Sequence, residues 1–298
     1  MSEFNEWEHN QDARKGLLFS ENIGPYLSID ETSLSHGELY TIVTNKAAKG
    51  KKGTLVAILE GTSSEIIIPM LQQLPAKLRN KVEEITLDLA GNMSLIAKRC
   101  FPNATIVMDR FHVQQLASEA LQEIRIKHRW EALDQENDAI DLARKTKTLY
   151  NPEVLSNGDT LKQLLARSRY LLYKSEEKWT HDQAARAALL FERYPDLKEA
   201  YGLSQRLSWI YTNTKEKIYA YTRLAKWHER VEKAGFKAFN TISKTIMNHY
   251  KRILNYFNNR STNASAESFN AKIKAFRANH RGVTDVNFFL FRLIKLYA

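Results

Sequence analysis

Cysteine is almost absent from this chain of 298 residues, which contains only Cys100. A lone cysteine forms neither an intrachain disulfide nor a thiolate zinc site, so any metal must be held by oxygen or imidazole ligands. Long apolar runs are missing too, since Ile66–Leu71 and Phe288–Leu293 are far too short to cross a bilayer. The stretch 1–15 lacks the basic-then-apolar order of a signal peptide. We therefore predict a cytoplasmic protein without a membrane partner.

Positive charge is in excess, and it is unevenly distributed. The formal net charge is +10, and the segment from Lys237 to the C-terminus holds eleven Lys or Arg residues against two acids, Glu267 and Asp285. The rest of the chain is close to neutral. Such a local surplus suits a phosphate backbone, although many basic proteins bind no nucleic acid.

The first hundred residues alternate between strand and helix patterns. Strands are predicted at Tyr26–Asp30, Leu39–Thr44, Leu55–Glu60, Glu84–Asp88 and Ala104–Asp109. Turns at His36-Gly37 and at 49–53 join the first three into an antiparallel meander. A helical pattern precedes each of the last two strands, and strand–helix–strand units of this kind favour parallel pairing of their strands. The prediction is an α/β fold: a mixed five-stranded sheet with flanking helices.

Helical patterns dominate the remainder. Amphipathic helices are predicted at Val113–Lys127, Leu161–Tyr173, Trp179–Phe191, Pro195–Asn213 and Thr214–Lys233, then at Ala264–Asn279 and Asp285–Tyr297. We therefore divide the chain into a lead segment (1–25), a first core part (26–113), an all-helical insertion (114–260) and closing core helices (261–298).

Two aspartates end predicted strands that should run parallel. Asp30 closes the first strand and Asp88 the fourth, and the carboxyl ends of parallel strands lie at one edge of a sheet. Paired carboxylates suit Mg²⁺ or Mn²⁺, and a two-ion clamp activates a water or 3′-hydroxyl for attack on a phosphodiester. The alternative is that each aspartate merely ends its strand.

A single acid stands among basic and amide side chains near the C-terminus. Glu267 shares one side of its predicted helix with Asn270, Lys274 and Arg277. A carboxylate in this setting is expected to coordinate a cation while its neighbours hold the DNA backbone. The alternative is an ion pair with Lys274, two turns away and too distant for good pairing.

The string Asp109-Arg110-Phe111-His112 closes the fifth strand and enters a helix. Asp109 and His112 share a helical face, so the carboxylate can accept a hydrogen bond from the imidazole and fix its tautomer. An Asp helix cap with an unrelated histidine is equally consistent with the residues. Glu31 points away from Asp30 by strand alternation and is assigned a supporting role.

Several of these strings together resemble one known family. They are Ser28-Ile29-Asp30-Glu31, Thr86-Leu87-Asp88, Phe101-Pro102-Asn103-Ala104, Val107 to Val113, and Asn263 to Lys274. The combination resembles the DDE transposases of the bacterial insertion-sequence family ISL-three, from about Tyr26 to the C-terminus. The resemblance implies an RNase H-like catalytic domain with an all-helical insertion, and Asp30, Asp88 and Glu267 as the metal-binding triad.

The resemblance carries further expectations. It makes Asp109 and His112 a functional pair, and it implies an insertion-domain tryptophan that handles a flipped base or hairpin, without choosing among Trp179, Trp209 and Trp227. The expected partners are transposon ends and target DNA, a homo-oligomer on the DNA, and two Mg²⁺ or Mn²⁺ ions in a nucleoid-associated enzyme.

The chain also departs from the family. Longer members carry an N-terminal zinc-binding and helix-turn-helix region, for which this sequence has no cysteine pair. Two explanations are open: a separate polypeptide recognises the transposon ends, or this chain is a partial reading frame. Two other functions remain open: a nuclease of the same fold that only hydrolyses DNA, and a non-catalytic DNA-binding protein derived from a transposase.

Overall fold

The computed structural model describes residues 2–34, 38–89, 91–279 and 285–298. The chain forms two compact units, unit 1 (residues 1–112 and 250–298) and unit 2 (residues 113–249). The predicted turn at His36-Gly37 lies outside the described residues. Each unit is considered by itself below.

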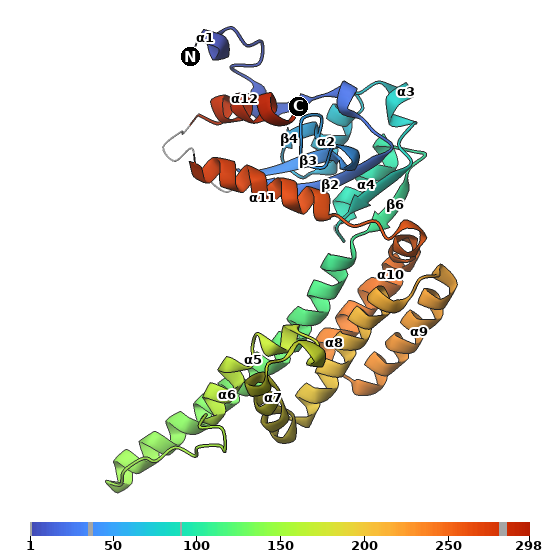
Figure 1. Cartoon of the computed structure of the whole chain (residues 1–298). Helices are drawn as coiled ribbons and strands as arrows, with labels where there is room; N and C mark the ends of the chain where they lie inside the picture. The colour runs from blue at the N-terminus through green and yellow to red at the C-terminus, as the bar shows by residue number, and fades with distance from the viewer. Residues whose placement is uncertain (1, 35–37, 90, 280–284) are drawn as a thin grey trace. The chain divides into compact units, whose positions relative to one another are not determined.

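Unit 1 is built on a mixed six-stranded sheet (Figure 1). Its strands are β1 (Gly16–Leu18), β2 (Tyr26–Ser33), β3 (Leu39–Asn45), β4 (Leu55–Glu60), β5 (Glu84–Leu87) and β6 (Thr105–Met108), in the order β1-β4-β3-β2-β5-β6. The first four strands in this order pair antiparallel, and β5 and β6 run parallel to β2. The predicted α/β class and mixed sheet are confirmed.

The sixth strand corrects the prediction of five. β1 pairs antiparallel with β4, with Gly16 opposite Leu59. A three-residue strand shows no usable alternation, so the sequence pattern did not reveal it. The lead segment also contacts the last helix, because the Phe4 ring meets Phe288 edge-on and Arg14 N donates to Asn287 Oδ1 at 2.8 Å.

Helices cover the sheet and form unit 2. They are α1 (Ser2–Asn5), α2 (Ser64–Leu71), α3 (Ala76–Arg79), α4 (Gly91–Cys100), α5 (Arg110–Thr146), α6 (Leu161–Arg167), α7 (His181–Arg193), α8 (Pro195–Asn213), α9 (Lys217–Ala234), α10 (Lys237–Asn259), α11 (Ala264–Asn279) and α12 (Val286–Tyr297). Short 3₁₀ turns lie in several of the connections, among them η3 (Lys46–Ala48) between β3 and β4. Among the described residues, no helix has both the length and the apolarity needed to cross a bilayer.

The last two helices pack into the core of unit 1. Phe269 and Ile273 of α11 and Phe289 of α12 belong to one buried apolar cluster with Ile42 and Ile58 of the sheet. Phe269 and Ile273 are four residues apart, which is the spacing of an apolar stripe along one side of a helix. Burial of large side chains of this kind stabilises by roughly 1.5–3 kcal/mol each, so α11 is held firmly against the sheet.

Two helices differ from the prediction. α5 continues past its predicted end at Lys127 to Thr146. The added part has a mostly polar surface, so no apolar period revealed it in the sequence. Ion pairs such as Lys127–Glu131 (3.8 Å) support the helix there. α10 was not predicted as a helix. Its last turns reach the sheet of unit 1, where Asn255 Nδ2 donates to Ile106 O at 2.8 Å. The second boundary between the two compact units falls between residues 249 and 250.

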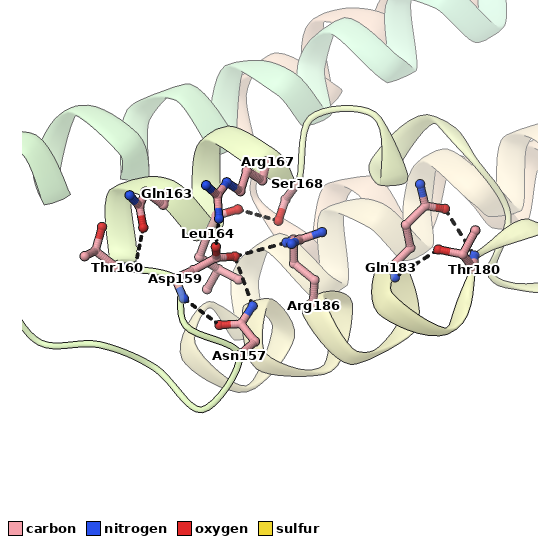
Figure 2. A network of polar contacts seen from close by, with 10 residues as sticks. All are labelled: Asn157, Asp159, Thr160, Gln163, Leu164, Arg167, Ser168, Thr180, Gln183 and Arg186. Atoms are coloured by element: carbon pink, nitrogen blue, oxygen red, sulfur yellow. Dashed lines mark hydrogen bonds and ion pairs between the residues drawn. The ribbon is translucent and has the colours of Figure 1, made fainter.

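The buried carboxylate of Asp159 holds the loop before α6 in place in unit 2. Asp159 is fully buried and accepts hydrogen bonds from the side chains of Arg167, Arg186 (3.1 Å) and Asn157 (3.0 Å), as Figure 2 shows. Burial by itself would raise the pKa of the Asp159 carboxyl, but the hydrogen bonds from Arg186 and Arg167 outweigh it and lower the pKa below its ordinary value. The ionised carboxylate thus ties the loop before α6 to α6 and α7.

We predict that Asp159→Asn destabilises unit 2 by about 1.5–3 kcal/mol, since hydrogen bonds to a charged group contribute about that much. Urea unfolding monitored by far-UV circular dichroism measures the change. Asp182→Asn is the matched control, because Asp182 is exposed on the same unit and should shift stability by less than about 0.5 kcal/mol. Equal effects of the two substitutions would contradict the structural role of Asp159.

Candidate active site

Strand register places three aspartates side by side. β2 and β5 pair with Ser28 opposite Thr86, so Asp30 and Asp88, each two residues further on, stand at the same level. β5 and β6 pair with Leu87 opposite Met108, so Asp88 and Asp109 follow their strands at the same level too. The Asp109 N–H donates to Leu87 O at 2.9 Å, which continues the ladder to this point. Asp30 lies within β2, which continues to Ser33, so the prediction that Asp30 closes its strand is wrong. The three carboxylates nevertheless lie in a row across neighbouring parallel strands.

Asp30 is held in place by two donors. Its Oδ1 accepts from the backbone N–H of Glu31 at 2.9 Å, and its Oδ2 accepts from Asn270 Nδ2 at 2.8 Å. Asn270 also reaches the carbonyl oxygen of Glu31 at 3.4 Å. The predicted supporting residue Asn270 therefore connects α11 to the end of β2.

The pKa of Asp30 shows which groups surround it. Burial raises this pKa from 3.8 to about 6; the hydrogen bond from the Glu31 N–H and the charge of His112 oppose the rise, while the carboxylates of Asp88 and Glu267 add to it. Asp30 is therefore within electrostatic range of Asp88, Glu267 and His112. A buried carboxylate surrounded by like charges is an environment that a divalent cation relieves.

Glu267 lies in the first turn of α11, and its N–H donates to Asn263 O at 3.0 Å. Burial raises the pKa of the Glu267 carboxyl, the charge of Asp109 raises it further, and His112 partly offsets both. Lys274 and Arg277, the two basic residues predicted on the same side of α11, have different surroundings. Lys274 is exposed, whereas the Arg277 guanidinium lies 5.2 Å from the centre of the Phe289 ring, against the core.

Asp109, His112 and Glu267 form a tight cluster. Each offers one ligand atom, and these atoms all lie within 4.8 Å of one another. Among the described residues, Asp30 and Asp88 lie outside this group. Both carboxylate oxygens of Asp109, Nε2 of His112 and Oε1 of Glu267 are buried without a hydrogen-bond partner. The expected hydrogen bond between Asp109 and His112 is therefore not formed.

These unpartnered atoms provide a test of whether a metal fits. Buried acceptors without donors are costly unless a cation or ordered water satisfies them. Carboxylate oxygens and an imidazole nitrogen are ordinary ligands of divalent ions. The residues present therefore fit a divalent metal.

Sequence reasoning missed a polar group behind the carboxylates. Lys46 Nζ donates to Thr86 Oγ1 at 2.8 Å and to Glu84 Oε1 at 3.4 Å, and Asn259 Nδ2 donates to Glu84 Oε2 at 3.3 Å. Burial lowers the pKa of Lys46, while Glu84 and Asp109 oppose this change. The available signal was Glu84, a charged residue at the start of the short strand β5.

The three tryptophans of interest in unit 2 have different surroundings. Trp227 is buried and donates to Leu203 O at 2.8 Å, and Trp179 donates to Leu171 O at 2.8 Å. Trp209 is 39% exposed, with the guanidinium groups of Arg206 and Arg223 at 4.2 and 4.9 Å from its ring centre. Trp227 and Trp179 are therefore structural, and Trp209 is open to a ligand.

Carboxylates on neighbouring parallel strands, with Glu267 of a late helix within electrostatic range, suit an enzyme that cleaves or transfers DNA with a divalent metal. The family model for the ISL3 type of DDE transposases, described as Transposase, matches residues 27–293, and the chain belongs to this family. Its α/β fold is accordingly of the RNase H-like type.

One relative extends the comparison. The chain is 24% identical over 274 residues to the transposase for insertion sequence element IS1001 of Bordetella parapertussis. The alignment covers 90% of this chain and 60% of that protein. No solved structure matches the chain significantly.

We predict that Asp30→Asn stabilises the metal-free chain at pH 7 by up to about 2 kcal/mol, because one pKa unit corresponds to about 1.4 kcal/mol. The folded pKa of Asp30 is raised, so the folded state binds the proton more tightly than the unfolded state does. The stability of the wild-type chain should therefore fall as pH rises from about 4 to about 6. Thermal unfolding with a chelator at pH 5 and pH 7 measures this difference.

Asp30→Asn should reduce that difference between the two pH values. The control Glu21→Gln, at an exposed acid of unit 1, should leave it unchanged. An equal pH dependence in the wild-type and Asp30→Asn chains would show that Asp30 titrates normally.

Proposed function

We propose that the chain is the catalytic part of a cut-and-paste DNA transposase, with Asp30, Asp88 and Glu267 as the acids of its DDE mechanism. The observation that supports this most is the register of β2 and β5, which sets Asp30 and Asp88 at one level. The influence of Glu267 on the pKa of Asp30 supports the membership of the third acid.

The proposed reaction has two steps. In the first, water attacks a phosphodiester at the transposon end, and the P–O3′ bond breaks to leave a 3′-hydroxyl and a 5′-phosphate. In the second, that 3′-hydroxyl attacks a target phosphodiester, forms a new P–O3′ bond and displaces the target 3′-oxygen. Two Mg²⁺ or Mn²⁺ ions, when bound, would polarise the attacking oxygen and stabilise the leaving oxygen.

The chain's own residues have distinct parts in this proposal. Asp30, Asp88 and Glu267 supply carboxylate ligands, and Asn270 fixes the orientation of the Asp30 carboxylate through its 2.8 Å hydrogen bond. Lys274 is exposed and suits a backbone phosphate, whereas Arg277 supports α11 by packing on Phe289.

DNA contact extends to unit 2 in this proposal. Trp209 with its two arginines combines a partly exposed aromatic ring with positive charge, and such surfaces stack unpaired bases and hold their phosphates. The substrates would be the transposon ends and target DNA in the bacterial nucleoid, with a homo-oligomer assembled on them. We further propose that a separate polypeptide recognises the transposon ends.

We expect Asp30→Asn, Asp88→Asn and Glu267→Gln each to lower metal-dependent cleavage at least about 100-fold, since each removes a preorganised charge from the reacting centre. Their affinity for DNA should change less than threefold. A gel assay of 3′-end cleavage, followed by joining of pre-cleaved ends to a target plasmid, measures both steps. Glu65→Gln, at an exposed acid of α2, is the control.

Cleavage that persists in any of the three variants would overturn the assignment of that acid. Cleavage without joined product in the wild-type chain would instead indicate a nuclease of the same fold. Binding without cleavage in the wild-type chain would indicate a non-catalytic DNA-binding protein.

We predict that the chain alone binds duplex DNA with a steep salt dependence and little sequence preference. Each phosphate neutralised by Lys or Arg contributes a slope of about −0.9 in log K against log salt. Fluorescence anisotropy with unrelated duplexes from 50 to 300 mM salt measures the slope. Tight binding to one end sequence at physiological salt would contradict the need for a separate recognition polypeptide.

A further inference from the structure

Four buried polar atoms without a hydrogen-bond partner, from three residues, belong to one cluster. Asp109 is 1% exposed, and neither of its carboxylate oxygens has a hydrogen-bond partner. His112 Nε2 and Glu267 Oε1 are buried and unpartnered as well. An ionised carboxylate buried without any donor is among the most costly groups in a protein interior. A cation bound from outside the chain would offset the cost of burying these atoms.

The nearby basic side chains are engaged elsewhere. Lys46 influences Asp109 electrostatically, but its ammonium group donates to Thr86 and Glu84. Arg110, which directly follows Asp109, donates to Tyr256 Oη at 3.2 Å. Within the part of the chain that the structure describes, neither cation hydrogen-bonds to the cluster.

The elements that carry the three residues hold them rigidly. Asp109 directly follows β6, and His112 lies one helical turn later in α5, so one strand–helix junction supplies two ligands. Glu267 comes from α11, which Phe269 and Ile273 anchor in the core. Ligand atoms within 4.8 Å of one another can surround a single ion.

The ligand chemistry selects a class of ion. Mg²⁺ prefers oxygen ligands alone and keeps much of its water, whereas Mn²⁺, Co²⁺ and Zn²⁺ accept an imidazole nitrogen together with carboxylates. We infer that Asp109, His112 and Glu267 bind one divalent transition-metal ion, with His112 Nε2 as a direct ligand, at a site separate from Asp30 and Asp88. Glu267 would be shared with the proposed catalytic site, so occupation of one site alters the other.

Mn²⁺ is a suitable probe because its bound form is paramagnetic. The full chain, stripped of metal with a chelator, is titrated with Mn²⁺ while the free ion is followed by electron paramagnetic resonance. Pulsed spectra of the bound ion then report coupling to ¹⁴N, which arises only when an imidazole coordinates. We expect ¹⁴N coupling in the wild-type chain, and we expect Mg²⁺ to displace the ion only at about 100-fold excess or more.

The variants separate this site from its neighbours. His112→Gln should remove the ¹⁴N coupling and weaken Mn²⁺ binding at this site at least tenfold, and Asp109→Asn should weaken binding to a similar extent. Asp30→Asn should keep the coupling, and so should His181→Gln, which removes an exposed imidazole of unit 2. Circular dichroism confirms that each variant is folded.

Each outcome separates the two proposals. Coupling that survives His112→Gln, an absence of coupling in the wild-type chain, or no Mn²⁺ binding at all would overturn the proposed site. If His112→Gln has no effect while Asp30→Asn abolishes both Mn²⁺ binding and DNA cleavage, this site is wrong and the proposed function stands. If the ¹⁴N coupling depends on His112 and the Asp30→Asn variant still cleaves DNA, the result supports this site and overturns the assignment of Asp30 as a catalytic acid.

Discussion

Parallel pairing of β2, β5 and β6 is the constraint on which the site depends. Because the strands run in the same direction and in a fixed register, residues at matching positions along them or just beyond them lie side by side. Asp30, Asp88 and Asp109 occupy those positions. A shift of one residue in either ladder would turn a carboxylate to the opposite face and dismantle the row. The site therefore requires the two ladders to keep their register, which the buried strand residues around them enforce.

A second constraint is the docking of α11. Phe269 and Ile273 anchor the helix in the core, and Asn270 hydrogen-bonds to Asp30. Glu267 lies three residues before Asn270, on the same side of the helix, and so faces the strand ends. The same contacts that stabilise the unit thus fix the distance between an acid near the C-terminus and acids of the sheet. A substitution that loosens the packing of α11 would therefore also move Glu267 relative to the strands.

Electrostatic strain follows from this arrangement. Burial and mutual repulsion raise the pKa of Asp30 and of Glu267, and Asp109 is buried without a donor. A folded protein tolerates such a cluster when a bound cation offsets the cost, because the ion supplies the charge that no side chain provides. The positive surplus of the C-terminal segment serves a different purpose in this scheme, since its exposed lysines suit DNA phosphates.

Local patterns in the sequence determined the class of fold, five of the six strands, and the candidate residues Asp30, Asp88, Asp109, His112 and Glu267, because strand alternation and helical spacing depend on near neighbours. Tertiary structure decided what near neighbours cannot encode. It added β1, whose three residues carry no period, extended α5 through a mostly polar surface, and formed α10, which had not been predicted. It also grouped Glu267 with Asp109 and His112, since the distance between an α11 side chain and a strand end is set by packing across the fold.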